Sequence, residues 1–239
     1  MNAYNNQSTR PKSILASALH QVLPLMLGYI PVGFAYGVLA QKSGISNINT
    51  LLMSLLVYAG SAQLIAVGLF AALANPLTIV ATTFIVNLRH VLMSAALAPY
   101  LGTWSKGKLA LFSGQMTDET FALHATRFAK GELQAKEIFS INIIAHSTWV
   151  GSTALGLAAS TLITDIRPIG LDFALPAMFI ALLLGQIKSP LHLGVAIFAG
   201  IVSTGLFMLG WTQAHVLTAT ILAATLGLGG YLWTKKSSL

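Results

Sequence analysis

The chain has 239 residues, of which 55% are hydrophobic and 8% charged, with a formal net charge of +7 and no cysteine. Its mean hydropathy of +0.76 excludes an ordinary water-soluble domain. The absence of cysteine excludes disulfides, thiolate catalysis and Cys-ligated metals. Lysine and arginine lie mostly between apolar runs, where they set orientation and meet lipid headgroups. The positive charge therefore does not indicate nucleic-acid binding.

Runs of about 20 apolar residues predict an all-α integral membrane protein, a polytopic bundle of seven or eight transmembrane helices. Long apolar runs such as 191–210 do not alternate with polar residues, as the strands of a membrane barrel would. A polar N-terminal tail (1–13), a single transmembrane domain (14–234) and a C-terminal tail (235–239) are expected. The predicted spans are 14–40, 50–73, 76–100, 137–163, 172–187, 190–210 and 214–234, and 109–128 is left open as an eighth.

Several predicted spans contain residues that interrupt helices. Small residues permit close helix packing; alternatively, a helix unwinds at mid-membrane and exposes its backbone to a ligand, as in transporters with broken helices. Both interpretations stay open here. Similar glycine spacing in the first and fourth spans also indicates an internal repeat, although chance explains it equally well. The residues concerned are Pro24, Gly28, Pro31, Gly33 and Gly37 in the first span, 59–62 in the second, Gly151 and Gly156 in the fourth, and Pro176 in the fifth.

The third span contains an arginine beside a histidine, in NLRHVLMSA at residues 87–95. Thr83, Asn87, His90 and Ser94 recur at helical spacing and predict one polar stripe. On a regular helix Arg89 points away from it, about 200° around from Asn87. Because an arginine in mid-bilayer costs a few kcal/mol or more, we expect an acidic partner, a carbonyl cluster or an anionic ligand. The arginine is either a structural ion pair or a functional group that binds a carboxylate or tunes proton transfer.

Asp118 and Glu119, in the segment TDETF, are the main candidate partners of this arginine. Thr117 followed by two acids is typical of a helix N-cap, and Arg127 would close the same short helix. Capping and function are compatible, because transporters place sites where half-helices begin. Asp172 also remains, but it begins the fifth span, where a cap or interface residue is common. Glu132 and Glu137 are set aside because they lie in a predicted solvated turn.

A second polar stripe in the fourth span repeats the spacing of the first and indicates a cavity between the two helices. Its histidine is either a satisfied hydrogen-bonding group or part of a proton relay. The sequence contains no His-x-x-x-His pair, nucleotide loop, nucleophile elbow or paired-acid motif, so we expect no metal, no cofactor and no enzymatic activity. The stripe consists of Asn142, His146, Trp149 and Thr153.

Five stretches in order along the chain resemble the AzlC family, the large subunit of branched-chain amino acid exporters. They are GYIPVGFAYGVLA (28–40), YAGSAQLIAVGL (58–69), FIVNLRHVLMSAALAP (84–99), TDETFAL (117–123) and DFALPAMFIALL (172–183). The resemblance implies a multi-pass secondary transporter of the bacterial inner (plasma) membrane that exports valine, leucine, isoleucine or similar amino acids. It also implies a small hydrophobic partner subunit of the AzlD type.

A zwitterionic aliphatic substrate needs a cation or helix N-terminus for its carboxylate, an acid or carbonyls for its ammonium, and an apolar pocket. The candidate binding residues are Arg89, Asn87, Ser61, Gln63, Tyr58, Asp118 and Glu119, and the candidates for proton coupling are His90, His146, Asp118 and Glu119.

The alternatives are a passive channel and a permease subunit of an ATP-driven transporter for small amphiphilic solutes. A membrane enzyme using Arg89, His90 and His146 would lack a recognisable nucleophile. The positive-inside rule leaves the side of the N-terminus open, because the answer depends on whether 109–128 spans.

Overall fold

The computed structural model describes residues 13–163, 165, 168, 170, 173, 176–177, 180, 183–185, 187, 189–211 and 215–236. Residues 1–12 of the predicted tail and much of the predicted fifth span, including Asp172, lie outside this set. All regular secondary structure in the described part is helical, which confirms the all-α prediction. The chain forms two compact units, 1–175 and 176–239, and each is described by itself.

The first unit contains one long helix at each end of its sequence and a series of shorter helices between them. The second unit contains two helices, α10 (Pro190–Met208) and α11 (His215–Lys236). The elements of the first unit are α1 (Ile14–Lys42), α2 (Asn47–Leu52), the π-helix η1 (Met53–Val57), α3 (Gly60–Ala71), α4 (Pro76–Asn87), α5 (Arg89–Leu97), the 3-10 helix η2 (Ala98–Tyr100), α6 (Lys106–Ser113), α7 (Asp118–Ala129) and α8 (Ala135–Ala159).

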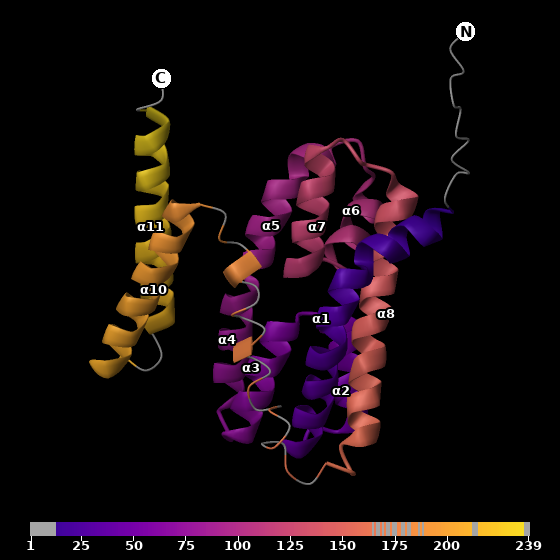
Figure 1. Cartoon of the computed structure of the whole chain (residues 1–239). Coiled ribbons are helices and arrows are strands. Elements are labelled where there is room, and N and C mark those ends of the chain that lie inside the picture. Colours follow the sequence, from indigo (N-terminus) through magenta and orange to yellow (C-terminus); the bar gives the residue numbers. More distant parts are fainter. Residues whose placement is uncertain are drawn as a thin grey trace. The chain divides into compact units, whose positions relative to one another are not determined.

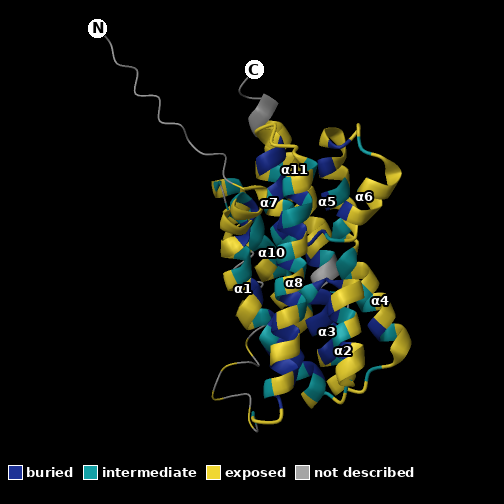
Figure 2. Ribbon diagram, turned by 90° about the vertical axis from the view of Figure 1, so that its right-hand side faces the viewer, coloured by how far each residue is buried: buried dark blue, intermediate teal, exposed yellow. Residues whose placement is uncertain are grey.

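Three described helical segments are long and apolar enough to cross a membrane: Ile14–Lys42, Pro76–Tyr100 and Pro190–Met208. Their outer faces carry large apolar side chains that would be costly in water. On α4, for example, Leu77 is 75% exposed and Phe84 65% exposed, and Figure 2 shows α4 largely as exposed and intermediate surface. Such a surface fits lipid rather than water, which confirms the membrane assignment.

α1 and α8 pack against each other in parallel. Ser17 of α1 lies beside Glu137 at the start of α8, and further along α1, Gly37 lies against Gly156 and its neighbours. A Cβ atom on Gly156 would overlap the carbonyl oxygen of Phe34, so these glycines allow two backbones to approach closely. α1 continues through Pro24 and Pro31. Of the two interpretations left open for the first span, the structure supports packing: the helix does not unwind, and Gly33 and Gly37 serve close packing against α8.

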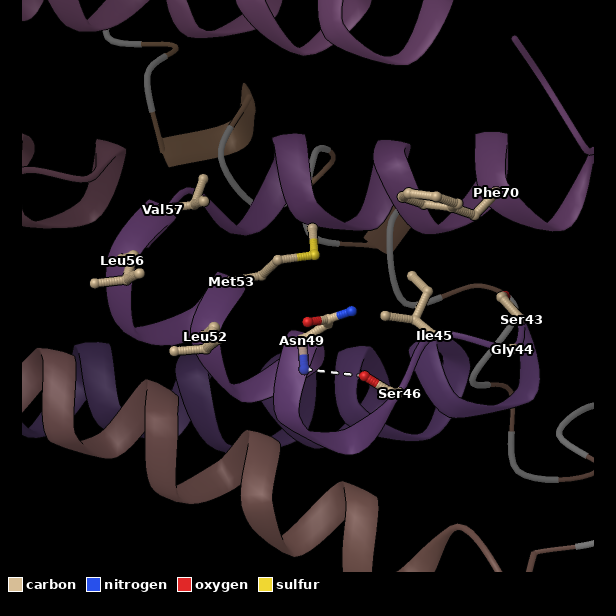
Figure 3. Close-up of a pocket in the computed structure, with 10 residues that line it drawn as sticks. All are labelled: Ser43, Gly44, Ile45, Ser46, Asn49, Leu52, Met53, Leu56, Val57 and Phe70. Carbon is tan, nitrogen blue, oxygen red and sulfur yellow. Dashed lines mark hydrogen bonds between the residues drawn. The ribbon is translucent and has the colours of Figure 1, made fainter. Parts of the chain in front are cut away.

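The second predicted span, 50–73, enters and leaves the bundle at the same end. α2 and η1 run inward, the chain turns at Tyr58, whose φ is 47° and ψ is 44°, and α3 runs back. Phe70, near the end of α3, lines one pocket with residues 43–46, which precede α2 (Figure 3). We call residues 47–71 the first hairpin. The predicted break at 59–62 is confirmed to within a residue or two, but the prediction that the segment crosses the membrane is wrong.

Residues 109–128, the possible eighth span, are likewise broken, and this segment does not cross the membrane. α4 and α5 run the other way through the bundle, and α6 and α7 follow at the end they reach (Figure 1). Phe128, near the end of α7, contacts Tyr100 of η2 with ring centroids 5.9 Å apart, so the chain returns to where it entered. We call residues 106–129 the second hairpin. The two hairpins enter from opposite ends.

In the second unit, α10 and α11 form an antiparallel pair. A Cβ atom on Gly227 would lie 3.0 Å from Val195, and one on Gly230 would lie 3.0 Å from Leu191, so the helices are close along this face. The two helices match the predicted spans 190–210 and 214–234 within a few residues.

Candidate functional site

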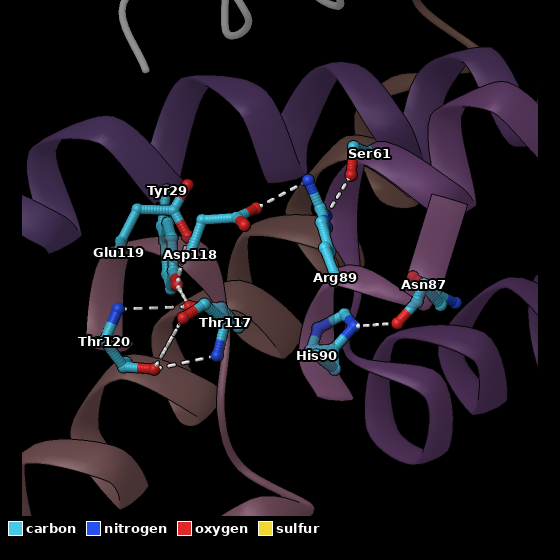
Figure 4. A network of polar contacts seen from close by, with 9 residues as sticks. All are labelled: Tyr29, Ser61, Asn87, Arg89, His90, Thr117, Asp118, Glu119 and Thr120. Atoms are coloured by element: carbon cyan, nitrogen blue, oxygen red, sulfur yellow. Dashed lines mark hydrogen bonds and ion pairs between the residues drawn. The ribbon is translucent and has the colours of Figure 1, made fainter. Parts of the chain in front are cut away.

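Arg89 joins the tips of the two hairpins. One terminal nitrogen of its guanidinium lies 2.8 Å from Asp118 Oδ2 at the start of α7. The other donates a hydrogen bond to the hydroxyl of Ser61, in the first turn of α3 (Figure 4). The expectation of an acidic partner for this arginine is confirmed, and the partner is Asp118. The side chains of Arg89 and Asp118 are 26% and 19% exposed.

The third predicted span is broken directly before Arg89. α4 ends at Asn87 and α5 begins at Arg89. The backbone N–H of Leu88, between them, is shared between the carbonyls of Phe84 at 3.0 Å and Ile85 at 3.2 Å. This local distortion lies next to Arg89, whose side chain reaches both hairpins.

Two helix N-termini face this arginine, and they differ chemically. α3 begins at Gly60, where the N-cap Ala59 makes no side-chain hydrogen bond and the first turn carries no acid. α7 begins at Asp118 with a capping box between Thr117 and Thr120, which confirms the predicted N-cap. Unpaired N–H groups and the helix dipole give each N-terminus a partial positive charge. Of the two, only the N-terminus of α7 is capped by its own side chains.

Tyr29 of α1 connects the second acid of the site to the first hairpin. Its hydroxyl donates to Glu119 Oε2 at 3.1 Å and lies 2.5 Å from Thr117 Oγ1. The ring meets Tyr58 edge-on, with centroids 6.4 Å apart, and packs in the same way on Trp149 of α8 at 5.5 Å. Through Tyr29, α1 thus contacts the tips of both hairpins.

Gln63 holds the first hairpin onto α8. Its Nε2 donates to Ser54 Oγ at 3.2 Å, and its Oε1 accepts from the indole of Trp149 at 3.2 Å. Ser54 also lies 2.8 Å from the hydroxyl of Thr153, and a Cβ atom on Gly60 would lie 2.8 Å from the Trp149 ring. Gln63, a predicted binding residue, therefore belongs to the contacts that hold the tip of the first hairpin against α8.

The predicted proton-coupling histidines lie on either side of this site. His146 stacks on Tyr58 with ring centroids 4.0 Å apart and contacts the Ser54 carbonyl through Nε2 at 3.3 Å. His90 Nδ1 lies 3.0 Å from the backbone carbonyl of Asn87. The side-chain oxygen of Asn87 is buried and has no hydrogen-bond partner among the described residues. The four residues of the first predicted stripe are half-buried, whereas Val91 and its neighbour Leu92 are exposed.

The second predicted stripe faces the hairpins and not the third span. Asn142 contacts the second hairpin, and His146, Trp149 and Thr153 contact the first. The predicted cavity between the third and fourth spans is therefore wrong, because the hairpin tips occupy that position. A stripe's periodicity indicates which face is buried, but it does not identify the neighbour.

A second charged network was not predicted. Arg127, at the far end of α7, lies 2.6 Å from Glu137 Oε2, and a second guanidinium nitrogen donates to Gln21 Oε1. Glu137 Oε1 accepts from Ser17 at 2.6 Å and from Gln21 at 2.7 Å. The Glu137 side chain is 13% exposed, so the predicted solvated position is wrong. The available signal was the helical spacing of Thr120, His124 and Arg127, which indicates one inward face.

Comparison with known proteins identifies the family. The model of the family described as "AzlC protein" matches residues 24–163, which run from α1 to just past α8 and include both hairpins. The chain belongs to the AzlC family. As an AzlC protein, it is 34% identical over 202 residues to an uncharacterized membrane protein of Archaeoglobus fulgidus, with 83% of this chain and 87% of that one covered.

Two relatives carry more specific names. The branched-chain amino acid transport protein AzlC of Bacillus subtilis is 28% identical over 216 residues, covering 89% of this chain and 84% of the relative. The inner membrane protein YgaZ of Escherichia coli is 30% identical over 193 residues, covering 77% and 79%. No solved structure matches the chain. The family and the apolar helices together establish a membrane protein.

Proposed function

We propose that this AzlC protein is a secondary transporter that exports branched-chain and similar aliphatic amino acids, driven by protons. A role in membrane transport follows from the family and its named relative. The observation that carries the finer proposal is the Arg89–Asp118 ion pair at 2.8 Å, which connects two half-helix N-termini inside the bundle.

The charges of this pair are suited to a zwitterion. A substrate carboxylate would bind between Arg89 and the uncapped N-terminus of α3, where a planar guanidinium and unpaired N–H groups both favour an anion. The substrate ammonium would bind Asp118. Each of these partly buried charges exchanges one partner for another, so neither is left unpaired. Without substrate the two residues neutralise each other.

Transport would then require the hairpin tips to separate from Arg89 alternately. The first hairpin leads to one end of the bundle and the second to the other, as the helices in Figure 1 show. If Asp118 leaves Arg89, the site opens along α7, and if Ser61 leaves, it opens along α3. One fixed cation between two movable tips supports alternating access at a single site.

The test is counterflow of labelled valine in proteoliposomes containing the purified protein. Arg89→Gln and Asp118→Asn are expected to reduce the exchange rate at least about tenfold, because each leaves a charge unpaired. Arg89→Lys is expected to retain little activity, since an ammonium cannot reproduce the planar pair of hydrogen bonds that a guanidinium donates to a carboxylate. Lys108→Gln, which removes an exposed cation on α6, is the matched control and should exchange normally.

Competition experiments separate a zwitterion site from an apolar pore. Leucine and isoleucine should compete with valine, whereas isovalerate and isoamylamine, which each lack one charged group, should compete poorly. Wild-type exchange by Arg89→Gln, or flux that does not saturate, would contradict the proposal and favour a channel.

A further inference from the structure

A buried polar pair joins α7 to α8 between the candidate site and the Arg127–Glu137 network. His124 Nε2 lies 2.7 Å from Asn142 Oδ1 of α8, and both residues are 0% exposed. His124 Nδ1 and Asn142 Nδ2 are also buried, and neither has a hydrogen-bond partner among the described residues. Buried polar atoms are normally paired, so two orphaned atoms on one pair call for an explanation.

Among the described residues, two aromatic rings and one amide pack against the imidazole. Phe112 of α6 and Phe128 of α7 pack against the ring, with centroids 5.4 and 5.5 Å away. The charged group that acts on it is Arg127 of the same helix, itself paired with Glu137 of α8. α8 faces the imidazole with the uncharged Asn142, and α6 faces it with Phe112. A positive imidazole is therefore disfavoured while this part of the bundle is closed.

We propose that His124 carries the coupling proton, an inference that depends on the transport proposal above. With Asn142 Oδ1 as the acceptor, the neutral ring keeps its hydrogen on Nε2 and presents a lone pair on Nδ1. One proton adds to Nδ1 and gives the imidazolium, and the same proton later leaves from Nδ1. The Nε2–H···Oδ1 bond persists in both states, so the ring keeps its position.

α7 connects this proton to the substrate. Asp118, in its first turn, holds Arg89, and His124 follows six residues later, about 9 Å along the same helix. A substrate ammonium replaces Arg89 on Asp118, and α7 shifts. The part of α7 that carries His124 then contacts water, and hydration lowers the free-energy cost of the imidazolium. When α7 returns, water is excluded from the imidazole again, and His124 loses the proton. Proton binding and the position of the second hairpin thereby become linked.

The experiment measures two activities in the same proteoliposomes: valine counterflow without a gradient, and valine accumulation driven by a pH gradient. His124→Gln keeps a hydrogen-bonding partner for Asn142 but cannot take the proton. We expect counterflow within about threefold of wild type and at least a tenfold loss of gradient-driven accumulation. His20→Gln is the matched control, because His20 is exposed on α1, and it should change neither activity.

A second variant tests the same claim without removing the histidine. Asn142→Asp places a carboxylate on Nε2, which favours the imidazolium, so the pH profile of gradient-driven transport should move to higher pH by about one unit or more. An unchanged profile would contradict the assignment, and it would do so even if His124→Gln failed to fold.

The other outcomes are equally decisive. Wild-type accumulation by His124→Gln, or parallel loss of both activities in a folded variant, would overturn the assignment to His124. Exchange by the wild type without any response to a pH gradient would overturn it too, while leaving the transport proposal intact. No exchange by the wild type would refute transport itself.

Discussion

Two arginines of this chain share the same chemistry but differ in setting. Arg89 has one carboxylate and one hydroxyl partner and is a quarter exposed, whereas Arg127 is 3% exposed and is held by Glu137 and Gln21. A pair that must exchange partners needs access to a ligand. A pair that only joins helices needs no such access and can be buried. This contrast supports the proposed binding role of Arg89 and indicates a structural role for Arg127.

At the residue scale, the Arg127–Glu137 pair predicts a large loss of stability. Glu137→Gln leaves a buried guanidinium without its counter-charge, so we expect the free energy of unfolding to fall by roughly 3 kcal/mol. Thermal unfolding in detergent measures it. Glu132→Gln is the control: this acid is 3.7 Å from Arg127 and 47% exposed, and its loss should cost less than about 1 kcal/mol. Equal effects of the two substitutions would contradict the structural assignment.

At the element scale, glycines of one helix predict opposite outcomes. Gly156→Ala would push a Cβ atom into the backbone of α1, and overpacking of this kind should lower the unfolding temperature by roughly 2–10 °C. Gly151, on the same helix, has nothing within 4 Å of its would-be Cβ atom. Gly151→Ala should therefore leave stability unchanged or raise it by up to about 1 kcal/mol, because alanine favours helix.

Thermal unfolding of both variants, each measured against wild type, checks this prediction. Destabilisation by Gly151→Ala as large as that by Gly156→Ala would mean that α1 and α8 do not pack through the face that carries Gly156. A neutral Gly156→Ala would mean the same.

The elements also show what could be predicted from sequence. Apolar length identified the helices, and the small residues at 59–62 identified a break. Periodicity could not distinguish a broken segment that crosses from one that turns back, because both bury similar residues. The turn itself depends on Tyr58, a residue that rarely adopts positive φ, so no local signal marked it. Arg89 was recognised by its charge, but its two partners, Asp118 and Ser61, come from the hairpins and could not be predicted from helical spacing.

At the scale of the whole molecule, the two hairpins determine how many segments run from one end of the bundle to the other, which the sequence left open. Because 47–71 and 106–129 turn back, only α1 and the α4–α5 segment lie between the start of the bundle and residues 101–105. The N-terminal end of α1 and residues 101–105 therefore lie at the same end. The AzlD-type partner subunit and the internal repeat stay predictions.

The distribution of exposed lysines then orients the first unit. Among its described residues, Lys106, Lys108, Lys130 and Lys136 are exposed at the end where α1 begins, and Lys42 is exposed at the other, four against one. The positive-inside rule therefore predicts that the end with four lysines faces the cytoplasm.

Because the chain has no cysteine, single cysteines can test this orientation directly. Asn47→Cys, at the start of the first hairpin, should react with a membrane-impermeant maleimide in intact spheroplasts. Thr103→Cys, before the second hairpin, should react only after permeabilisation. Both positions are exposed, so accessibility to water is matched. The reverse labelling pattern would invert the orientation, and labelling of both positions from outside would contradict the assignment of the hairpins to opposite ends.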